Sequence, residues 1–154
     1  MQLFRIAQEK FANDLSGNGA KLFGGRWNSE GLPVVYAASY RSLALLETLA
    51  HTPAKILNSR SFILVTLDIP DNNFIKIEVN DLPADWDVPD IRPFTQKTGD
   101  QFLKSQKKLA LSVPSVLMPE ENNYIINPMH PDFRKVKIID QRRILFDKRA
   151  VSNL

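Results

Sequence analysis

Apolar and polar positions along the chain predict short strands and helices that follow one another without a fixed order. Residues 33–39, PVVYAAS, have the pattern of a short strand, and residues 40–51, YRSLALLETLAH, that of an apolar helix with Ser39 as its expected N-cap. The continuous apolar run at 62–70, FILVTLDIP, is typical of a buried strand, whereas NFIKIEV at 73–79 predicts a half-buried one. The first half of the chain therefore supplies both kinds of element.

The second half combines proline-rich loops with one helix and further strands. The Pro- and Asp-rich stretch 81–94 predicts a loop, and the capping-box spacing of Thr98 and Gln101 predicts a helix that starts there and continues to residue 109. Residues 119–132 are expected to be loop around a short YII core. Three more strands are expected, at 109–113, 136–139 and 143–146. Because no regular strand–helix–strand rhythm emerges, we expect an α+β fold rather than a doubly wound sheet.

Length and composition indicate one folded domain over residues 1–154. A domain of this size buries roughly two-thirds of the surface that its unfolded chain exposes, and the contents of 44% apolar and 24% charged residues are those of a globular protein. No internal repeat or linker marks a second domain. The start of the chain lacks the apolar run of a signal peptide, and no eighteen apolar residues follow one another, so we expect a cytoplasmic protein that has no membrane partner.

The inventory of reactive side chains excludes several kinds of site. The chain has no cysteine, which excludes disulfides, thiolate metal sites and cysteine nucleophiles, and with two histidines no metal site is expected. The net charge of +3 favours an anionic ligand without identifying it. Basic residues of segment 134–149 alternate with strand-like apolar positions, as on a solvated sheet edge, so we do not expect direct nucleic-acid binding.

A glycine-rich segment at residues 17–28, GNGAKLFGGRWN, holds four of the six glycines. Glycine lets backbone N–H groups point at an anion, yet neither standard phosphate motif fits: Gly25-Arg26 stands where a P-loop has Lys and Ser/Thr, and Leu22 replaces the last glycine of a dinucleotide fingerprint. A plain glycine-rich hairpin and an anion site both stay open. The forked guanidinium of Arg26 suits a pyrophosphate or carboxylate and favours the anion site.

Glu47 interrupts the otherwise apolar helix at 40–51. A helix of this kind is normally buried, and burying an unpaired carboxylate costs several kcal/mol, so a cation or ligand is expected nearby. Two interpretations stay open: a structural salt bridge to Arg26 or Arg41, and a functional carboxylate.

Tyr36, Trp27 and Ser115 also have both structural and functional interpretations. Each aromatic ring either packs in the core or stacks on a flat heterocycle. The hydroxyl of Ser115, in SVPSVL, either orients a ligand amide or ribose or satisfies a backbone group. We do not expect Ser115 to be a nucleophile, because no motif links it to a histidine and the chain has no GxSxG sequence.

Residues 127–133, NPMHPDF, predict a rigid multi-turn in which Asn127 and Asp132 cap their own backbone. His130 within this turn is not favoured as a general base. His51, at the end of a helix, is expected to cap that helix or to lie on the surface.

Taken in order, several segments of the chain resemble the RES domain family, which is named for its Arg, Glu and Ser positions. The matching segments are LFRIA at 3–7, DLSGNGAKLFGGRWNSEGLPVVYAAS at 14–39, ALLETLAH at 44–51, VPSVLMPEENNYIINPMHPDF at 113–133 and FDKR at 146–149. They cover most of the chain, whereas 52–112 carries no comparable signature. The resemblance implies a fold similar to that of ADP-ribosyltransferases, with a split β-sheet core and flanking helices.

The resemblance also implies an activity and a partner. RES proteins are toxins of bacterial toxin–antitoxin pairs and consume NAD, which implies cleavage of the nicotinamide–ribose bond by an NAD glycohydrolase or an NAD phosphorylase, with water or phosphate as acceptor. NAD is then the substrate, and no separate cofactor is implied. The implied partner is an antitoxin with an Xre-like helix-turn-helix domain that blocks the active site. The oligomeric state stays open, a homo-oligomer included.

Site residues follow from the matching motifs: Arg26 of GGRWN, Tyr36 of VVYAA, Glu47 of LLETL, Ser115 of VPSV and, more loosely, Asn127 of INPMHPDF. The resemblance implies that Glu47, Arg26 and Ser115 form the catalytic group.

Each residue has an expected role in NAD cleavage. Nicotinamide leaves as a neutral molecule, so the reaction needs no proton donor to the leaving group but does need a carboxylate, Glu47, to stabilise an oxocarbenium-like ribose. In an extended loop beside a strand, Arg26 would hold the pyrophosphate with help from the Gly25 backbone and Lys21. Tyr36 would stack near the nicotinamide. Ser115 would orient the ribose or the amide, and Asn127 would contribute to substrate binding.

Two other functions fit the same residues. A protein ADP-ribosyltransferase would use the same site, since transfer of ADP-ribose passes through the same intermediate with a different nucleophile. From a different class, a small basic RNA-binding or RNA-cleaving toxin would draw on the Lys- and Arg-rich C-terminal segment.

Overall fold

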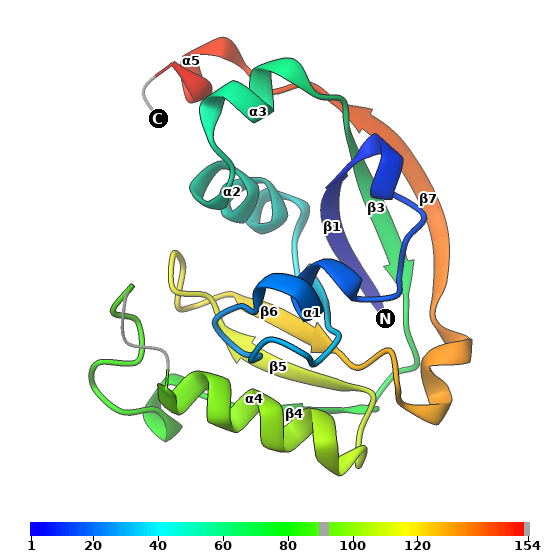
Figure 1. The fold of residues 1–154 in the computed structure, drawn as a ribbon, viewed down its shortest axis with the longest axis vertical. Helices are drawn as coiled ribbons and strands as arrows, with labels where there is room; N and C mark the ends of the chain where they lie inside the picture. Colours follow the sequence, from blue (N-terminus) through cyan, green and yellow to red (C-terminus); the bar gives the residue numbers. More distant parts are fainter. Residues whose placement is uncertain (90–92, 153–154) are drawn as a thin grey trace.

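In the computed structural model, which describes residues 1–89 and 93–152, strands form one seven-stranded mixed sheet in the order β4-β5-β6-β2-β1-β3-β7 (Figure 1). The strands are β1 (Gln2–Gln8), β2 (Val35–Ala38), β3 (Phe62–Asp68), β4 (Phe74–Lys76), β5 (Ala110–Pro114), β6 (Asn122–Ile126) and β7 (Lys137–Ile144). The α-helices are α1 (Asn18–Phe23), α2 (Arg41–His51), α3 (Ala54–Ser59), α4 (Pro93–Ser105) and α5 (Lys148–Val151), and short 3-10 helices occupy Glu9–Phe11, Val79–Asp81 and Pro131–Lys135.

The sheet consists of two halves that meet at a single residue pair. β1 pairs with β3 and β3 with β7 along their lengths, while β2, β6, β5 and β4 form the other half. Between β1 and β2 the register contains only Phe4 opposite Ala38. The strands of the two halves run in different directions (Figure 1). The expected α+β class, with a split sheet and flanking helices, is confirmed.

One face of the sheet carries the predicted site residues. Directly opposite residues of antiparallel strands point to the same face, so Asn123, which lies opposite both Ala38 and Val113, shares a face with Tyr36 two residues before Ala38. α2 packs on this face in one apolar cluster, and α4 packs on it in another. The opposite face is covered by the segment after β1 and by the 3-10 helix at 131–135.

Three strands and one helix lie where the sequence predicts them: β2, β3 and β5 within or next to 33–39, 62–70 and 109–113, and α2 within 40–51. The apolar runs of the three strands are mostly buried, and β5 is buried at every position. The expectation of a buried helix is wrong for most of α2, in which only Leu43 and Ala44 are buried. The YII core expected within a loop is longer than predicted, because it forms strand β6 between β2 and β5.

Two predictions for the later strands are wrong. The half-buried strand expected at 73–79 is limited to the edge strand β4, where Ile75 is exposed, and it pairs in parallel with β5. The two strands expected at 136–139 and 143–146 are a single strand, β7, because pairing with β3 continues through the exposed polar residues between the two apolar runs.

Both predicted helix starts are also wrong. Tyr40, not Ser39, is the N-cap of α2, and the Ser39 hydroxyl instead accepts the backbone N–H that begins β6. α4 begins at Pro93, so Thr98 lies inside the helix, where its hydroxyl donates to the carbonyl of the preceding turn. Proline suits the first helical position because its φ is already helical and the N–H that it lacks is not needed there.

Within the described residues, four strands or α-helices have no counterpart among the predicted elements: β1, α1, α3 and α5. Strand β1 lies inside the sheet, and the glycine-rich segment contains α1 instead of being wholly extended loop. Gly24, with a φ of +67°, ends this helix. In this left-handed region glycine avoids the strain of a side chain.

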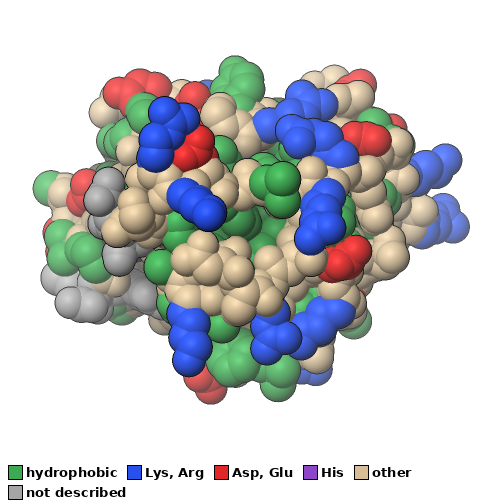
Figure 2. Space-filling model, turned by 90° about the horizontal axis from the view of Figure 1, so that it is seen from above, with side chains coloured by type: hydrophobic (Ala, Val, Ile, Leu, Met, Phe, Trp, Pro, Cys, Tyr) green, Lys and Arg blue, Asp and Glu red, His purple; other side chains and the backbone are tan. Residues whose placement is uncertain are grey.

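The end of the molecule that carries α3 and α5 is rich in basic side chains. Viewed from this end, Lys and Arg side chains surround a patch of apolar ones (Figure 2). Lys55, Arg60 and Lys148 are exposed on or beside these helices, and Arg149 pairs with Asp147 at 2.8 Å. The basic residues of β7 are exposed on an edge strand, as the alternation in segment 134–149 indicates.

Candidate active site

The carboxylate of Glu47 lies where α2 faces the turn between β5 and β6. The Ser115 hydroxyl donates to Glu47 Oε1 at 2.8 Å, and the Asn123 side-chain amide donates to the same oxygen at 2.5 Å. His51 Nδ1 lies 3.3 Å from the other oxygen, Oε2. The Glu47 side chain is 21% exposed. The carboxylate is thus held through Oε1 and reaches the surface near Oε2.

These three residues, and not Arg41, are the partners of Glu47 in the structure. Arg41 instead lies over the ring of Phe4, with its guanidinium carbon 4.1 Å from the ring centre. Ser115 and Asn123 are neutral donors, so they satisfy hydrogen-bonding capacity of the carboxylate without cancelling its charge. The site therefore keeps a negative charge that a cationic ligand or intermediate can use.

Ser115 is completely buried, and its hydroxyl serves three groups at once. It donates to Glu47 and accepts from the backbone N–H groups of Leu117 and Met118, at 3.1 and 3.2 Å. One donor and two acceptor positions are all that a hydroxyl offers. Ser115 therefore holds both the turn after β5 and the Glu47 carboxylate.

Substitution of Ser115 by alanine should lower the free energy of unfolding by about 1–3 kcal/mol, because two backbone donors and one carboxylate oxygen lose a partner. The Ser112 hydroxyl is a matched control: it is also fully buried on β5, and within the described residues it has no hydrogen-bond partner. Ser112→Ala should leave stability unchanged or raise it. Denaturant unfolding of both variants checks this, and equal losses would contradict the role given to Ser115.

A second group of contacts surrounds Arg26. The Tyr36 hydroxyl donates to Asn28 Oδ1 at 2.7 Å and accepts the Trp27 backbone N–H at 3.2 Å. A Cβ on Gly25 would lie 2.8 Å from that hydroxyl, so the close approach of this backbone to Tyr36 requires glycine. Tyr36 thereby fixes the loop on both sides of Arg26.

Asn28 is a site-forming residue that has no counterpart among the predicted ones. Its side chain is fully buried, and its amide donates to the carbonyls of Ala20 and Leu32 at 2.9 and 3.0 Å. It therefore ties α1 to the segment that leads into β2. An asparagine in a glycine-rich loop usually signals a turn, so the sequence pattern alone does not reveal this connecting role.

The Arg26 side chain reaches the Pro- and Asp-rich stretch. Its Nη1 donates to the carbonyl of Trp86 at 2.9 Å and lies 3.4 Å from that of Val88. Hydrogen bonds from a guanidinium to a charged oxygen are roughly twice as strong as those between neutral groups. A phosphate oxygen can therefore compete with these two carbonyls for Nη1.

Helix α4 supports the Arg26 loop from the other side. The Gln96 amide donates to the Gly25 carbonyl at 3.0 Å, and Asp100 accepts both the backbone N–H and the hydroxyl of Ser29, at 2.9 and 2.6 Å. Gly99 of the same helix lies directly against the Trp27 backbone. The loop is thus held by side chains from α4 on one side and by Tyr36 on the other.

The two groups share one sheet face. Tyr36 of β2 lies directly opposite Ile125 of β6, and Asn123 lies two residues before Ile125. Tyr36 and Asn123 are therefore diagonal neighbours on adjacent strands. This diagonal spacing is about 7–8 Å. The structure therefore brings Glu47 and Ser115 into contact and places Tyr36, which closely approaches the Gly25 backbone, on the same sheet face as Asn123.

Asn127 lies outside this arrangement. Asn127 is buried at the far end of β6, about 13 Å from Asn123 at the usual rise per strand residue, and its side chain bonds to the Leu103 carbonyl and the Met129 N–H. The expected self-capping turn at Asn127 is confirmed. Lys21 is exposed on α1.

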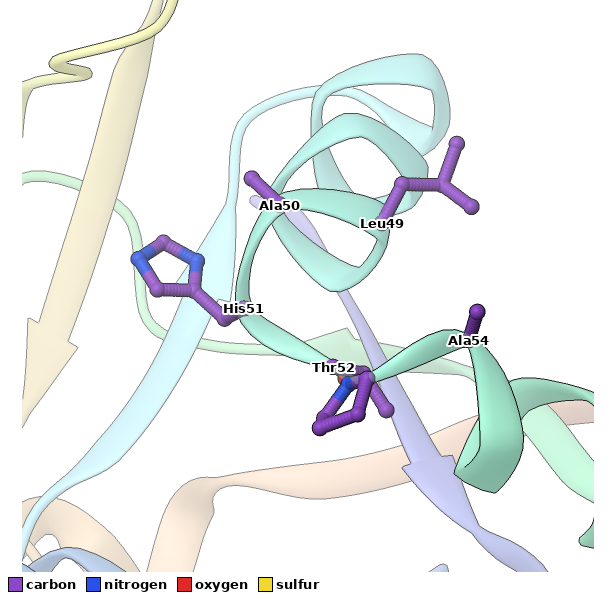
Figure 3. Close-up of a pocket in the computed structure, with 6 residues that line it drawn as sticks. Leu49, Ala50, His51, Thr52 and Ala54 are labelled. Atoms are coloured by element: carbon purple, nitrogen blue, oxygen red, sulfur yellow. The ribbon is translucent and has the colours of Figure 1, made fainter. Parts of the chain in front are cut away.

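An open hollow adjoins the Glu47 group at the end of α2. Its volume is about 370 Å³, and residues 49–54 line it. The His51 ring lies on one side of the helix and Leu49 on the other (Figure 3). His51 Nδ1 also contacts the Glu47 carbonyl at 2.8 Å, as expected of a histidine that caps a helix end. His51 thus connects the hollow to the carboxylate.

Metal ligands and membrane spans are both absent from the part of the chain that the structure describes. Within it no group of three or more His, Cys, Asp or Glu residues is arranged to hold a metal ion. Nor does any helix within residues 1–89 and 93–152 combine the length and apolar character needed to cross a membrane.

Comparison with protein families and curated proteins gives matches over most of the chain. A family model described as "RES domain" matches residues 2–147. A protein of Sphingobium sp. named "Prs ADP-ribosylating toxin" is 43% identical over 143 residues, which cover 91% of this chain and 88% of that protein. A "Toxin Res" from Photorhabdus laumondii is 40% identical over 136 residues, 88% of this chain and 86% of that protein.

A solved structure shares the fold. A chain in the crystal structure of the M. tuberculosis MbcT-MbcA toxin-antitoxin complex matches with a TM-score of 0.79 and 19% identity, over 99% of this chain and 87% of that chain. At this identity the likeness concerns the fold, an ADP-ribosyltransferase-like split sheet, and it confirms the fold expected from the sequence motifs.

Proposed function

This chain belongs to the RES domain family, and on that basis we propose that it is the toxin of a toxin–antitoxin pair and degrades NAD in the cytoplasm. The observation that carries the proposal is the Glu47 carboxylate, held through one oxygen by Ser115 and Asn123 and partly exposed. The family members that it resembles in sequence are named as toxins, and one is named for ADP-ribosylation, a reaction that consumes NAD.

The proposed reaction breaks the bond between C1′ of the ribose and the nicotinamide nitrogen. The bonding electrons leave with the nitrogen, which converts the cationic pyridinium into neutral nicotinamide and leaves positive charge on the ribose. Glu47, negative and close by, stabilises that charge. The acceptor oxygen of water or phosphate then bonds to C1′, and with water a proton is released to solvent. Ser115 and Asn123 keep the carboxylate in place during these steps.

In this proposal Arg26 binds the pyrophosphate of NAD. The substrate replaces the carbonyls of Trp86 and Val88 as acceptor for the guanidinium, while Tyr36 and α4 keep the loop in position. Because the Tyr36 hydroxyl holds the loop, stacking of its ring near the nicotinamide would use a side chain that is already fixed.

Arg26→Lys should raise the KM for NAD about tenfold or more and change kcat less, because lysine keeps the charge but loses the forked pair of donors. Steady-state kinetics with NAD measures both constants. Arg134→Lys, on the exposed 3-10 helix at 131–135, is the matched control and should behave as the unmodified protein. A large fall in kcat with an unchanged KM would contradict a binding role for Arg26.

The acceptor determines which enzyme this is. Incubation of the protein with NAD, with and without inorganic phosphate, followed by mass spectrometry, separates three products: ADP-ribose from water, its 1″-phosphate from phosphate, and ADP-ribosylated protein. We expect free ADP-ribose or its phosphate. Intact NAD in every reaction would overturn the proposal.

Protein ADP-ribosylation is the second candidate, because the Sphingobium relative is named for it. The chemistry up to the ribose cation is the same, and only the nucleophile differs. Incubation with labelled NAD and candidate proteins, in the absence of phosphate, tests it. Label that appears on protein at a rate exceeding release of ADP-ribose would favour this activity.

The proposed partner is an antitoxin with an Xre-like helix-turn-helix domain that covers the site. The shared fold with a chain of the MbcT-MbcA complex supports such a partner. Co-purification of this protein with the product of its neighbouring gene, followed by an NAD assay of the complex, tests both the interaction and its inhibitory effect.

A further inference from the structure

Asn123 contacts Glu47 although no motif singles it out. The residue lies on β6, 76 positions after Glu47, and its backbone pairs with Ala38 and Val113 on the neighbouring strands. Backbone pairing does not depend on the side chain, so the sheet does not require asparagine at this position. The polar side chain must be explained by what it touches, which is Glu47 Oε1.

The two donors to Oε1 come from opposite sides of one turn. Ser115 directly follows β5, and Asn123 lies on β6, which is the next strand in the chain and in the sheet. One donor leaves a carboxylate free to rotate about the bond that joins it to the side chain. Two donors that approach the same oxygen from the two sides of this turn fix both the position and the plane of the carboxylate.

This arrangement makes the two carboxylate oxygens unequal. Oε1 has two strong partners, whereas the contact of Oε2 is with His51, whose side chain is 73% exposed. Oε2 is therefore the oxygen that faces a substrate. From this geometry we infer that Asn123 is a positioning residue, which fixes Glu47 so that Oε2 points at the reacting ribose; the inference rests on the proposed function.

Steady-state kinetics of Asn123→Ala and Asn123→Asp test the inference. Loss of one hydrogen bond to a charged group should lower kcat about tenfold and leave the KM for NAD within about twofold. Aspartate has nearly the same size as asparagine but cannot donate and adds a second negative charge, so Asn123→Asp should lower kcat more than a hundredfold. Thermal unfolding verifies that each variant is folded at the assay temperature.

Asn122→Ala is the matched control, because Asn122 is the same residue type on the same strand and points to the opposite sheet face. Its kcat should equal that of the unmodified protein. Unchanged kcat in Asn123→Ala, or a raised KM with unchanged kcat, would overturn the inference.

A crystal structure of Asn123→Ala separates failure of this inference from failure of the proposed function. If the unmodified protein leaves NAD intact, the proposed function fails, and the position of Glu47 then decides the inference alone. A Glu47 carboxylate rotated away from its position against Ser115 supports positioning by Asn123. A carboxylate that keeps both its place and its plane overturns it.

Discussion

Glu47→Gln should lower the rate of NAD consumption by about 10²–10³-fold or more while leaving the protein folded. Glutamine retains an oxygen that accepts from both Ser115 and Asn123, so the hydrogen bonds at Oε1 survive. What disappears is the negative charge that stabilises the ribose cation. Release of nicotinamide, measured by chromatography together with thermal unfolding, gives both quantities from the same preparation.

The choice of glutamine over alanine determines what this experiment can show. Glu47→Ala leaves the Ser115 and Asn123 donors without their acceptor, so it should also destabilise the fold. A loss of activity could then come either from the missing negative charge or from the weakened fold. Glu120→Gln, an identical change at an exposed position in the β5–β6 turn, is the control and should be fully active. A Glu47→Gln variant that consumes NAD as fast as the unmodified protein would contradict the proposed role of the carboxylate.

Gly99→Ala should cause a larger loss of stability than Ser115→Ala. A Cβ at this position would overlap the Trp27 carbonyl oxygen and lie 2.7 Å from its carbon, and both atoms are backbone. The helix or the Arg26 loop must move, so we expect a loss of about 3 kcal/mol or more. Thermal denaturation should show this as a fall in Tm of roughly 6–12 °C.

Gly19→Ala, in contrast, should increase the stability of the protein. Gly19 lies within α1, and a Cβ there would meet no atom within 4 Å. Alanine favours a helix over glycine by about 0.5–1 kcal/mol, so Gly19→Ala should raise Tm by a few degrees. If Gly99→Ala proves as stable as the unmodified protein, α4 does not approach Trp27 as closely as the structure indicates.

The sequence predicts elements best where burial alone determines them. The continuous apolar run of β3 lies where the pattern places it because it is mostly buried in the sheet. The apolar helix α2 also lies where expected, although only its Leu43 and Ala44 are buried. The pattern predicts β7 in two pieces because its exposed middle residues carry no apolar signal, although pairing with β3 makes the strand continuous. The start of α4 escapes the pattern because Pro93 is as typical of a loop as of the first turn of a helix.

Site residues could be predicted from the sequence only where the residue type is unusual for the segment around it. Glu47 is a charge in an apolar helix, and Arg26 stands in a glycine-rich segment, so both attract notice in the sequence. Asn123 and Asn28 do not, because asparagine is common in turns, and their partners lie far away in the chain or in the backbone. For the same reason the sequence leaves a salt bridge and a functional role for Glu47 both open: the neutral donors to its carboxylate lie beyond residue 110.

The distance along the chain between Glu47 and its two donors has a consequence for the order in which the site forms. Ser115 and Asn123 follow Glu47 by 68 and 76 residues. During synthesis the arginine loop and the carboxylate leave the ribosome well before the β5–β6 hairpin that holds the carboxylate. A chain truncated before β6 would carry Arg26, Tyr36 and Glu47 and still lack the ordered site, so the proposed activity begins only after β6 has been synthesised.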